Sequence, residues 1–166
     1  MIQKKVALLG ASGVGKTSLV RQFVDSLFDD KYLTTIGVKV DKKVVAVDGR
    51  EVTLMVWDVF GQDDFQTVGA TELRGMSGYL LVVDGTRRQT LDTARDLQER
   101  ATAAVGPVPF ILLLNKSDLA AQWALSAEEE AALGRRGPVF RTSARSAERV
   151  EEAFLELARR VTPPPD

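Results

Sequence analysis

Cysteine and histidine are both absent from the 166-residue chain, and each absence removes a class of chemistry. Without cysteine there can be no disulfide, no thiolate metal site and no lipid attached through a thiol. Without histidine, a general base must be a carboxylate, a lysine, a tyrosine or the substrate itself. No apolar run approaches the roughly 20 residues that a membrane-spanning helix needs. These absences predict a cytoplasmic protein with no direct lipid anchor.

A strong excess of charge is also missing, because 22 Lys and Arg residues stand against 23 Asp and Glu residues, for a net charge of −1. No overall field attracts nucleic acid or an acidic membrane surface, so we expect no nucleic-acid partner. Hydrophobic residues make up 45% and charged residues 27%, which is typical of globular proteins. The length predicts a single domain over residues 1–162, followed by a short proline-rich tail at 163–166.

Short apolar runs alternate with stretches of helical periodicity, which predicts an α/β fold: a mostly parallel sheet with helices on both faces. Most of the runs are continuously apolar, so both faces of the sheet should be buried. Asp48-Gly49 predicts a tight hairpin, which places one antiparallel strand at the sheet edge. The four main runs are residues 4–10, 51–58, 78–84 and 109–116.

Helical periodicity follows Thr17, recurs over residues 88–104, and ends the chain before the proline run. Ser126 and Glu129 have the spacing of a capping box, which predicts the start of a further helix. The last helix has apolar residues at core spacing, namely Val150, Ala153, Phe154, Leu157 and Val161.

The stretch GASGVGKTS follows the first apolar run and contains the spacing G-x-x-x-x-G-K-T, in which successive backbone N–H groups point at an anion. Because it lies between an expected strand and an expected helix, loop amides and the helix N-terminus both address phosphates. Lys16 would reach the β- and γ-phosphates, and Thr17 would hold Mg²⁺. A glycine turn with a surface lysine is the alternative. The expected phosphate-binding residues are Gly10, Ser12, Gly13, Val14, Gly15, Lys16, Thr17 and Ser18.

A second motif, VWDVFGQDD, places Asp58 at the end of a buried strand, where a carboxylate can lie beside the metal. Gly61 would let its backbone N–H approach the γ-phosphate closely. Gln62 has a neutral side chain able to orient an attacking water. Read alone, this pattern is more often a turn.

A third motif, LNKSD, indicates which base is bound. The two oxygens of Asp118 match the parallel N1–H and 2-amino donors of guanine, whereas adenine presents an acceptor where guanine presents N1–H. Asn115 and the stem of Lys116 would brace the ring and the loop, and TSAR at 142–145 is a further loop on the base side. Read alone, NKSD is ordinary polar loop composition. An ATP-using kinase with the same phosphate loop is a weaker alternative, against which Asp118 argues.

In their order and at nearly their usual spacing, the three motifs resemble those of the Ras superfamily of small GTPases over essentially the whole chain. TTIGV (34–38) and WDVFGQDDF (57–65) are most similar to the Rab and Ras-like branches. The resemblance implies a P-loop G domain with five parallel strands, one antiparallel strand and five helices. It also implies a switch that binds GTP or GDP with Mg²⁺ and hydrolyses GTP slowly, with Lys16 and Gln62 as catalytic residues.

The same resemblance implies that Thr35 closes onto Mg²⁺ and the γ-phosphate, so that Thr17, Thr35 and Asp58 form the metal site. Residues 28–38 and 59–74 would be two switch segments that meet effectors, GTPase-activating proteins and exchange proteins.

On the base side, Phe28 matches an aromatic residue that packs on guanine in the family, with a core aromatic as an equal alternative. Ser143, Ala144 and Arg145 match a base-side S-A-K motif in which arginine replaces lysine. Because this motif contacts the base largely through its backbone, we expect the arginine to cause little loss of guanine binding.

The chain departs from the family pattern at Phe60, where most relatives have alanine, and at Ser12, which adds slight bulk near the γ-phosphate. These departures keep open a non-hydrolysing GTP-binding scaffold as an alternative function. The C-terminal RRVTPPPD lacks the prenylated cysteine of many eukaryotic relatives, which is typical of a bacterial or archaeal member or of a trimmed chain.

Arginine pairs at 87–88, 135–136 and 159–160 are expected to be solvated helix ends rather than docking sites for acidic partners. No motif places an arginine to act on the phosphates in cis, so we expect a partner protein to supply one.

Overall fold

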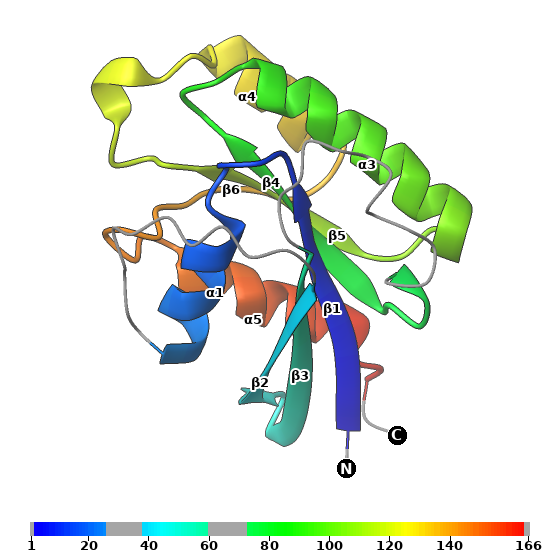
Figure 1. The fold of residues 1–166 in the computed structure, drawn as a ribbon. Helices are drawn as coiled ribbons and strands as arrows, with labels where there is room; N and C mark the ends of the chain where they lie inside the picture. Colours follow the sequence, from blue (N-terminus) through cyan, green and yellow to red (C-terminus); the bar gives the residue numbers. More distant parts are fainter. Residues whose placement is uncertain (1, 26–37, 60–72, 165–166) are drawn as a thin grey trace.

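A six-stranded sheet with helices on both faces forms the protein, in a computed structural model that describes residues 2–25, 38–59 and 73–164 (Figure 1). This is the predicted α/β architecture of a mostly parallel sheet covered by helices. The described residues contain four α-helices, and the fifth helix that the resemblance implies is not among them. The strands are β1 (Ile2–Gly10), β2 (Val38–Val47), β3 (Arg50–Val59), β4 (Gly78–Asp84), β5 (Phe110–Asn115) and β6 (Val139–Arg141). The helices are α1 (Lys16–Asp25), α3 (Gln89–Val105), the 3₁₀ helix η1 (Ala120–Gln122), α4 (Ala127–Gly134) and α5 (Val150–Val161).

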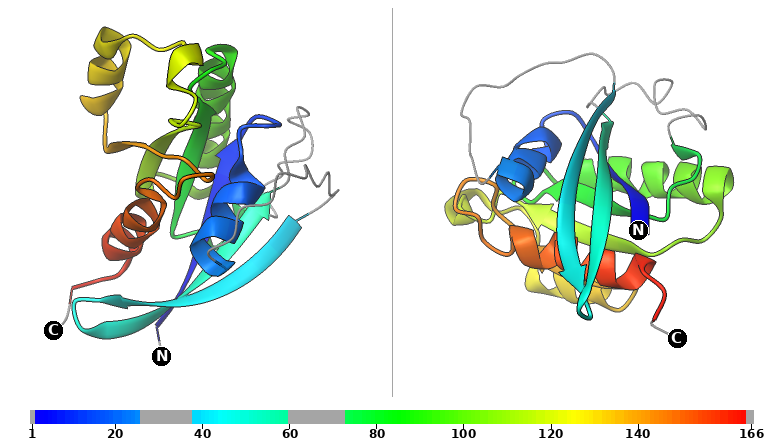
Figure 2. Two further views of the ribbon diagram at one scale, coloured as in Figure 1. Left: turned by 90° about the vertical axis from the view of Figure 1, so that its left-hand side faces the viewer. Right: turned by 90° about the horizontal axis from the view of Figure 1, so that it is seen from below.

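The strand order is β2-β3-β1-β4-β5-β6, and β2 with β3 is the one antiparallel pair of this sheet within the described residues. The turn between these two strands has positive φ angles at Asp48 (51°) and Gly49 (79°), which a two-residue hairpin turn of the primed type requires. The predicted antiparallel edge strand is therefore confirmed, and it is β2. The long curved ribbon of this hairpin is clear in Figure 2.

Alternate residues of β1 face opposite layers of the protein, as the period of a strand requires. Val6 and Leu8 belong to the core beneath α1 and α5. Ala7 and Leu9 belong to the core beneath α3 and α4. The sheet is thus buried on both faces, which explains why its strands are continuously apolar. Figure 2 shows the two helical layers on either side of the sheet.

Predicted helix ends are also confirmed. The backbone N–H of Glu129 donates to Ser126 Oγ at 3.1 Å, and the backbone N–H of Ser126 donates to Glu129 Oε1 at 3.3 Å, so the capping box of α4 is complete. Helix α5 ends at Val161, and only its C-cap residue Thr162 precedes the proline run. Within the described ranges, no helix is long and apolar enough to cross a membrane.

Candidate functional site

Four strands end at one edge of the sheet, and three of them carry a polar residue there. Gly10 is the last residue of β1, Asp84 of β4 and Asn115 of β5, and Asp58 is the second-last residue of β3. These strands are parallel neighbours, so their carboxyl ends meet at the same edge. In an open α/β sheet this edge is where ligands bind.

The loop between β1 and α1 contains two glycines with backbone angles that other residues adopt only at an energetic cost. The φ angle is 77° at Gly13 and 105° at Gly15, in a region that L side chains rarely adopt. A side chain at Gly15 would also collide with the amide of Asn115. The close approach of this loop to β5 therefore depends on glycine.

Lys16 connects the two ends of this loop. Its backbone begins α1, while its Nζ donates to the carbonyl oxygens of Gly10 at 2.8 Å and Ala11 at 3.2 Å. The side chain is only 5% exposed, so its charge is held at the loop rather than in solvent. A buried ammonium beside a helix N-terminus forms a positive site suited to an anion such as phosphate.

Thr17 and Asp58 lie beside this loop as a hydrogen-bonded pair. The hydroxyl of Thr17 donates to Asp58 Oδ2 at 2.7 Å, and Asp58 is only 1% exposed. Hydroxyl and carboxylate oxygens are the hard donors that Mg²⁺ prefers. The chemistry of this donor set fits the predicted Mg²⁺ site.

Asn115 joins the loop to the segment predicted to read the base. Its Nδ2 donates to the carbonyl oxygen of Val14 at 2.9 Å, and its Oδ1 accepts from the hydroxyl of Thr142 at 3.1 Å. Asn115 is 1% exposed and Thr142 is completely buried. Three segments that are distant in the sequence are therefore held together by one amide.

Asp118 is oriented by Ser143. The Ser143 hydroxyl donates to Asp118 Oδ1 at 2.8 Å and accepts from the backbone N–H of Ser146 at 3.0 Å. Ser143 and Ala144 are buried, whereas Arg145 is exposed. The LNKSD and TSAR motifs thus meet, with a carboxylate fixed at their junction.

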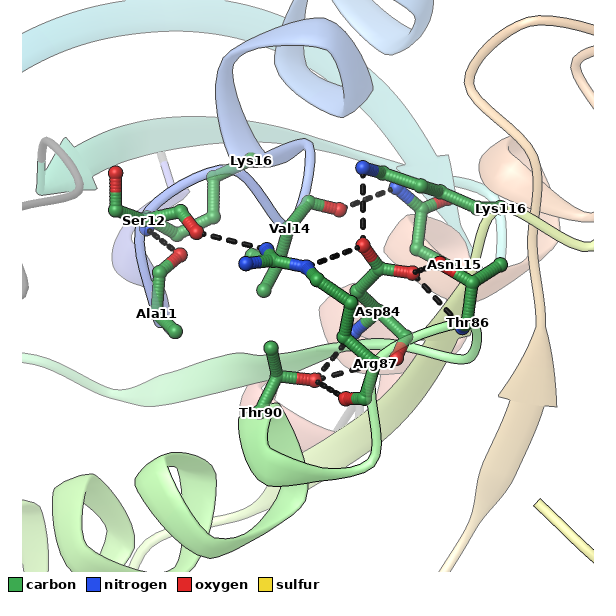
Figure 3. Close-up of polar contacts among 10 residues, drawn as sticks. All are labelled: Ala11, Ser12, Val14, Lys16, Asp84, Thr86, Arg87, Thr90, Asn115 and Lys116. Carbon is green, nitrogen blue, oxygen red and sulfur yellow. Dashed lines mark hydrogen bonds and ion pairs between the residues drawn. The ribbon is translucent and has the colours of Figure 1, made fainter. Parts of the chain in front are cut away.

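Lys116 takes part in a second network, which sequence reasoning did not predict. Its Nζ lies 3.0 Å from Asp84 Oδ2, and the Nε of Arg87 lies 3.0 Å from the same oxygen. The other carboxylate oxygen of Asp84 accepts from the hydroxyl and the backbone N–H of Thr86. Figure 3 shows this cluster beside the loop that contains Ser12.

Burial raises the pKa of the Asp84 carboxyl, but the hydrogen bonds from these three neighbours outweigh that effect and hold its pKa below the ordinary value. Arg87 also donates from Nη2 to the carbonyl oxygen of Ser12 at 2.9 Å. The expectation that Arg87 is a solvated helix end is therefore wrong, because two acceptors hold its guanidinium. The position of Asp84 at a strand end, followed by a glycine and a basic pair, is the signal that could have indicated this cluster.

Several predicted site residues lie outside the described residues, namely Phe28, Thr35, Phe60, Gly61 and Gln62. Most of the two predicted switch segments lie there too. Their roles stay predictions.

A sequence model of the Ras family matches residues 5–163. The chain is also 37% identical over 161 residues to Ras-related protein Rab-13 of Canis lupus familiaris, in an alignment that covers 93% of this chain and 78% of that protein.

Proposed function

The chain belongs to the Ras family of GTP-binding switch proteins, and from this premise we propose that it binds GTP and GDP together with Mg²⁺ and slowly hydrolyses GTP to GDP and phosphate. The observation that carries the proposal is the hydrogen bond from Asn115 to Val14. It joins the loop proposed to bind the phosphates to the strand end that leads into the LNKSD motif, which supports one nucleotide that contacts both.

In this proposal Lys16 and the amides of the loop bind the phosphates, and the oxygens of Thr17 and Asp58 hold Mg²⁺ with Thr35. The metal supplies charge neutralisation at the phosphate oxygens. Lys16 is already desolvated and held by two carbonyl oxygens, so it needs little reorganisation to act on charge that develops there.

On the base side, Asp118 accepts the two parallel donors of guanine, and Ser143 keeps the carboxylate in that orientation. Phe28, Ala144 and Arg145 complete this side. Adenine would set an acceptor against Asp118, so we propose strong discrimination against ATP.

Hydrolysis and switching depend on residues for which the proposal rests on the family alone. Gln62 orients the attacking water, and Gly61 meets the γ-phosphate. Effectors, activating proteins and exchange proteins contact residues 28–38 and 59–74, and an activating partner supplies an arginine worth roughly 10³–10⁵ in rate.

The test combines binding of fluorescent GDP, GTP and ATP in the presence of Mg²⁺ with single-turnover GTP hydrolysis. We expect tight binding of both guanine nucleotides, much weaker binding of ATP, and hydrolysis that Gln62→Leu abolishes. Gln122→Leu is the control, because Gln122 is an exposed residue of η1. If wild type hydrolyses GTP no faster than Gln62→Leu, the enzyme proposal fails and the non-hydrolysing scaffold remains. Equal affinity for ATP and GTP would overturn the assignment of Asp118.

A further inference from the structure

Arg87 bridges a buried carboxylate and the backbone of the phosphate loop. Its Nε donates to Asp84 Oδ2 at 3.0 Å, and its Nη2 donates to the carbonyl oxygen of Ser12 at 2.9 Å (Figure 3). Ser12 and Arg87 are 75 positions apart in the sequence. One guanidinium therefore ties the loop after β1 to the loop after β4.

The carbonyl that Arg87 holds belongs to the Ser12–Gly13 peptide unit, which is trans like every peptide bond of the described residues. In a planar trans peptide the C=O and the N–H point in opposite directions. Because the Ser12 carbonyl is directed at Arg87, the Gly13 N–H is directed away from it. A hydrogen bond from a cation to the carbonyl also polarises the peptide and makes its N–H a stronger donor.

Gly13 allows Arg87 to come this close. A Cβ at residue 13 would lie 3.2 Å from Arg87 Nη2, and the φ of Gly13 is 77°. Any side chain there would strain the backbone and press on the guanidinium. The conformation of the loop and the position of Arg87 thus depend on each other.

Asp84 holds the other side of Arg87. The carboxylate is 1% exposed, and it also pairs with Lys116 at 3.0 Å and with the hydroxyl and backbone N–H of Thr86. Thr90 steadies the same turn, because its hydroxyl accepts from the Asp84 backbone N–H and donates to the Arg87 carbonyl oxygen. Arg87 is therefore anchored in a network that includes Lys116 of the predicted guanine-binding motif.

We propose that Arg87 is a positioning residue for nucleotide binding: by holding the Ser12 carbonyl it directs the Gly13 N–H at a phosphate oxygen, and through Asp84 it couples the phosphate loop to Lys116. The inference rests on the proposed function, since it assigns a role in binding the same nucleotide. It requires arginine, because only a planar guanidinium can bond a carboxylate and a carbonyl with two separate nitrogens in fixed geometry.

The test compares Arg87→Met with Arg88→Met in the full chain. Arg88 is the neighbouring residue and carries the same charge, but its side chain is 64% exposed, against 40% for Arg87, and it pairs with Glu129 on α4. Two quantities are measured: the rate of release of fluorescent GDP in Mg²⁺, and the amide resonance of Gly13 in ¹⁵N-labelled protein with GDP bound. Arg87→Met should speed GDP release by about tenfold or more, since it removes a hydrogen bond to a charged group.

Arg87→Met should also move the Gly13 amide proton upfield, because the peptide loses its polarising partner. Arg88→Met should leave the Gly13 resonance in place and change GDP release by less than about twofold, as expected of an exposed ion pair. Arg87→Lys should fall between wild type and Arg87→Met. If Arg87→Met does not fold, Arg87→Lys is used in its place. Faster GDP release and a shifted Gly13 resonance in Arg87→Lys would then support the proposal.

Equal GDP release from Arg87→Met and Arg88→Met would overturn the inference, and so would faster release with an unmoved Gly13 resonance, which indicates a merely structural role. Failure of the proposed function is recognised separately, because wild-type protein would then retain no GDP in the same assay. If wild type retains GDP and Arg87→Met releases it no faster, the role of Arg87 is refuted while the proposed function stands.

Discussion

The hydroxyl of Ser143 donates a hydrogen bond to Asp118 Oδ1 at 2.8 Å, across 25 positions of sequence. The protein thus holds one carboxylate oxygen of Asp118, and this contact fixes the direction of the other oxygen. Because Ser143 is fully buried and also accepts from the backbone N–H of Ser146, its hydroxyl has a single arrangement that satisfies both partners.

Replacement Ser143→Ala should therefore weaken GTP and GDP binding by about tenfold, which corresponds to loss of one hydrogen bond of a charged group. Equilibrium titration with fluorescent nucleotides measures the effect. Ser146→Ala is the matched control: it keeps the backbone N–H that Ser143 accepts from, and its hydroxyl is exposed. Unchanged nucleotide affinity in Ser143→Ala would show that Asp118 needs no such support.

Gly15→Ala should lower the free energy of unfolding by at least about 1 kcal/mol, because alanine is strained at a φ of 105°. The new methyl group would also collide with the Asn115 amide and so displace the bond to Val14. Urea unfolding measures the first effect and nucleotide titration the second. In the control Gly134→Ala, nothing lies within 4 Å of the added methyl group, so stability should stay the same or rise slightly. Equal behaviour of the two variants would contradict the account of this loop.

Phe154→Ala should destabilise the protein by about 3–5 kcal/mol, the usual cost of removing a buried aromatic ring. The Phe154 ring is fully buried and stacks on Phe23 with centroids 4.0 Å apart, so it joins α5 to α1. Val44→Ala on β2, where the side chain is 57% exposed, should change stability by less than about 0.5 kcal/mol. Urea unfolding measures the stability of both variants. A loss of stability in Phe154→Ala no larger than that in Val44→Ala would contradict this packing.

Asp84→Asn should show a stability loss that depends on pH. The folded pKa of Asp84 lies below its ordinary value of 3.8, so at mildly acidic pH the unfolded chain takes up the proton first. The stabilisation from the carboxylate is therefore complete above about pH 5 and disappears as the pH falls through the lowered folded pKa. Urea unfolding between pH 7 and pH 3 should give a difference from wild type of about 1–3 kcal/mol at pH 7 that narrows below about pH 4.

Asp92→Asn is the control for this titration, because Asp92 lies on the neighbouring helix α3 with its side chain 79% exposed. Its effect should be small throughout the range. A stability difference for Asp84→Asn that stays constant down to pH 3 would mean that the carboxylate is not held in its charged form.

Much of the fold could be predicted because its signals are local. The apolar run that forms β1, the Asp48-Gly49 turn and the capping box of Ser126 and Glu129 each depend on residues a few positions apart, and each was confirmed. The bounds of β1, β3, β4 and β5 differ from the four predicted runs by at most two residues, since an apolar run continues until a turn residue ends it.

The chemistry of the candidate site could also be predicted from the sequence, because its residues lie in three short motifs. These are the loop of Gly10 to Thr17, the stretch around Asp58 and LNKSD. Their meeting at one sheet edge follows from parallel strands. What spacing could not supply was the partner of each side chain, such as Ser143 for Asp118.

By itself the sequence determined the family, the order of strands and helices, and which loops have the chemistry to bind a guanine nucleotide, because these depend on local backbone preference and on hydrophobic periodicity. Only the tertiary structure decided the role of Arg87. Its two acceptors come together because the registers of β1 with β4 and of β4 with β5 bring Ser12, Asp84 and Lys116 to the same place. A basic pair at the start of a helix does not reveal such a contact, because in sequence alone an arginine that bridges two loops and an arginine in solvent look the same.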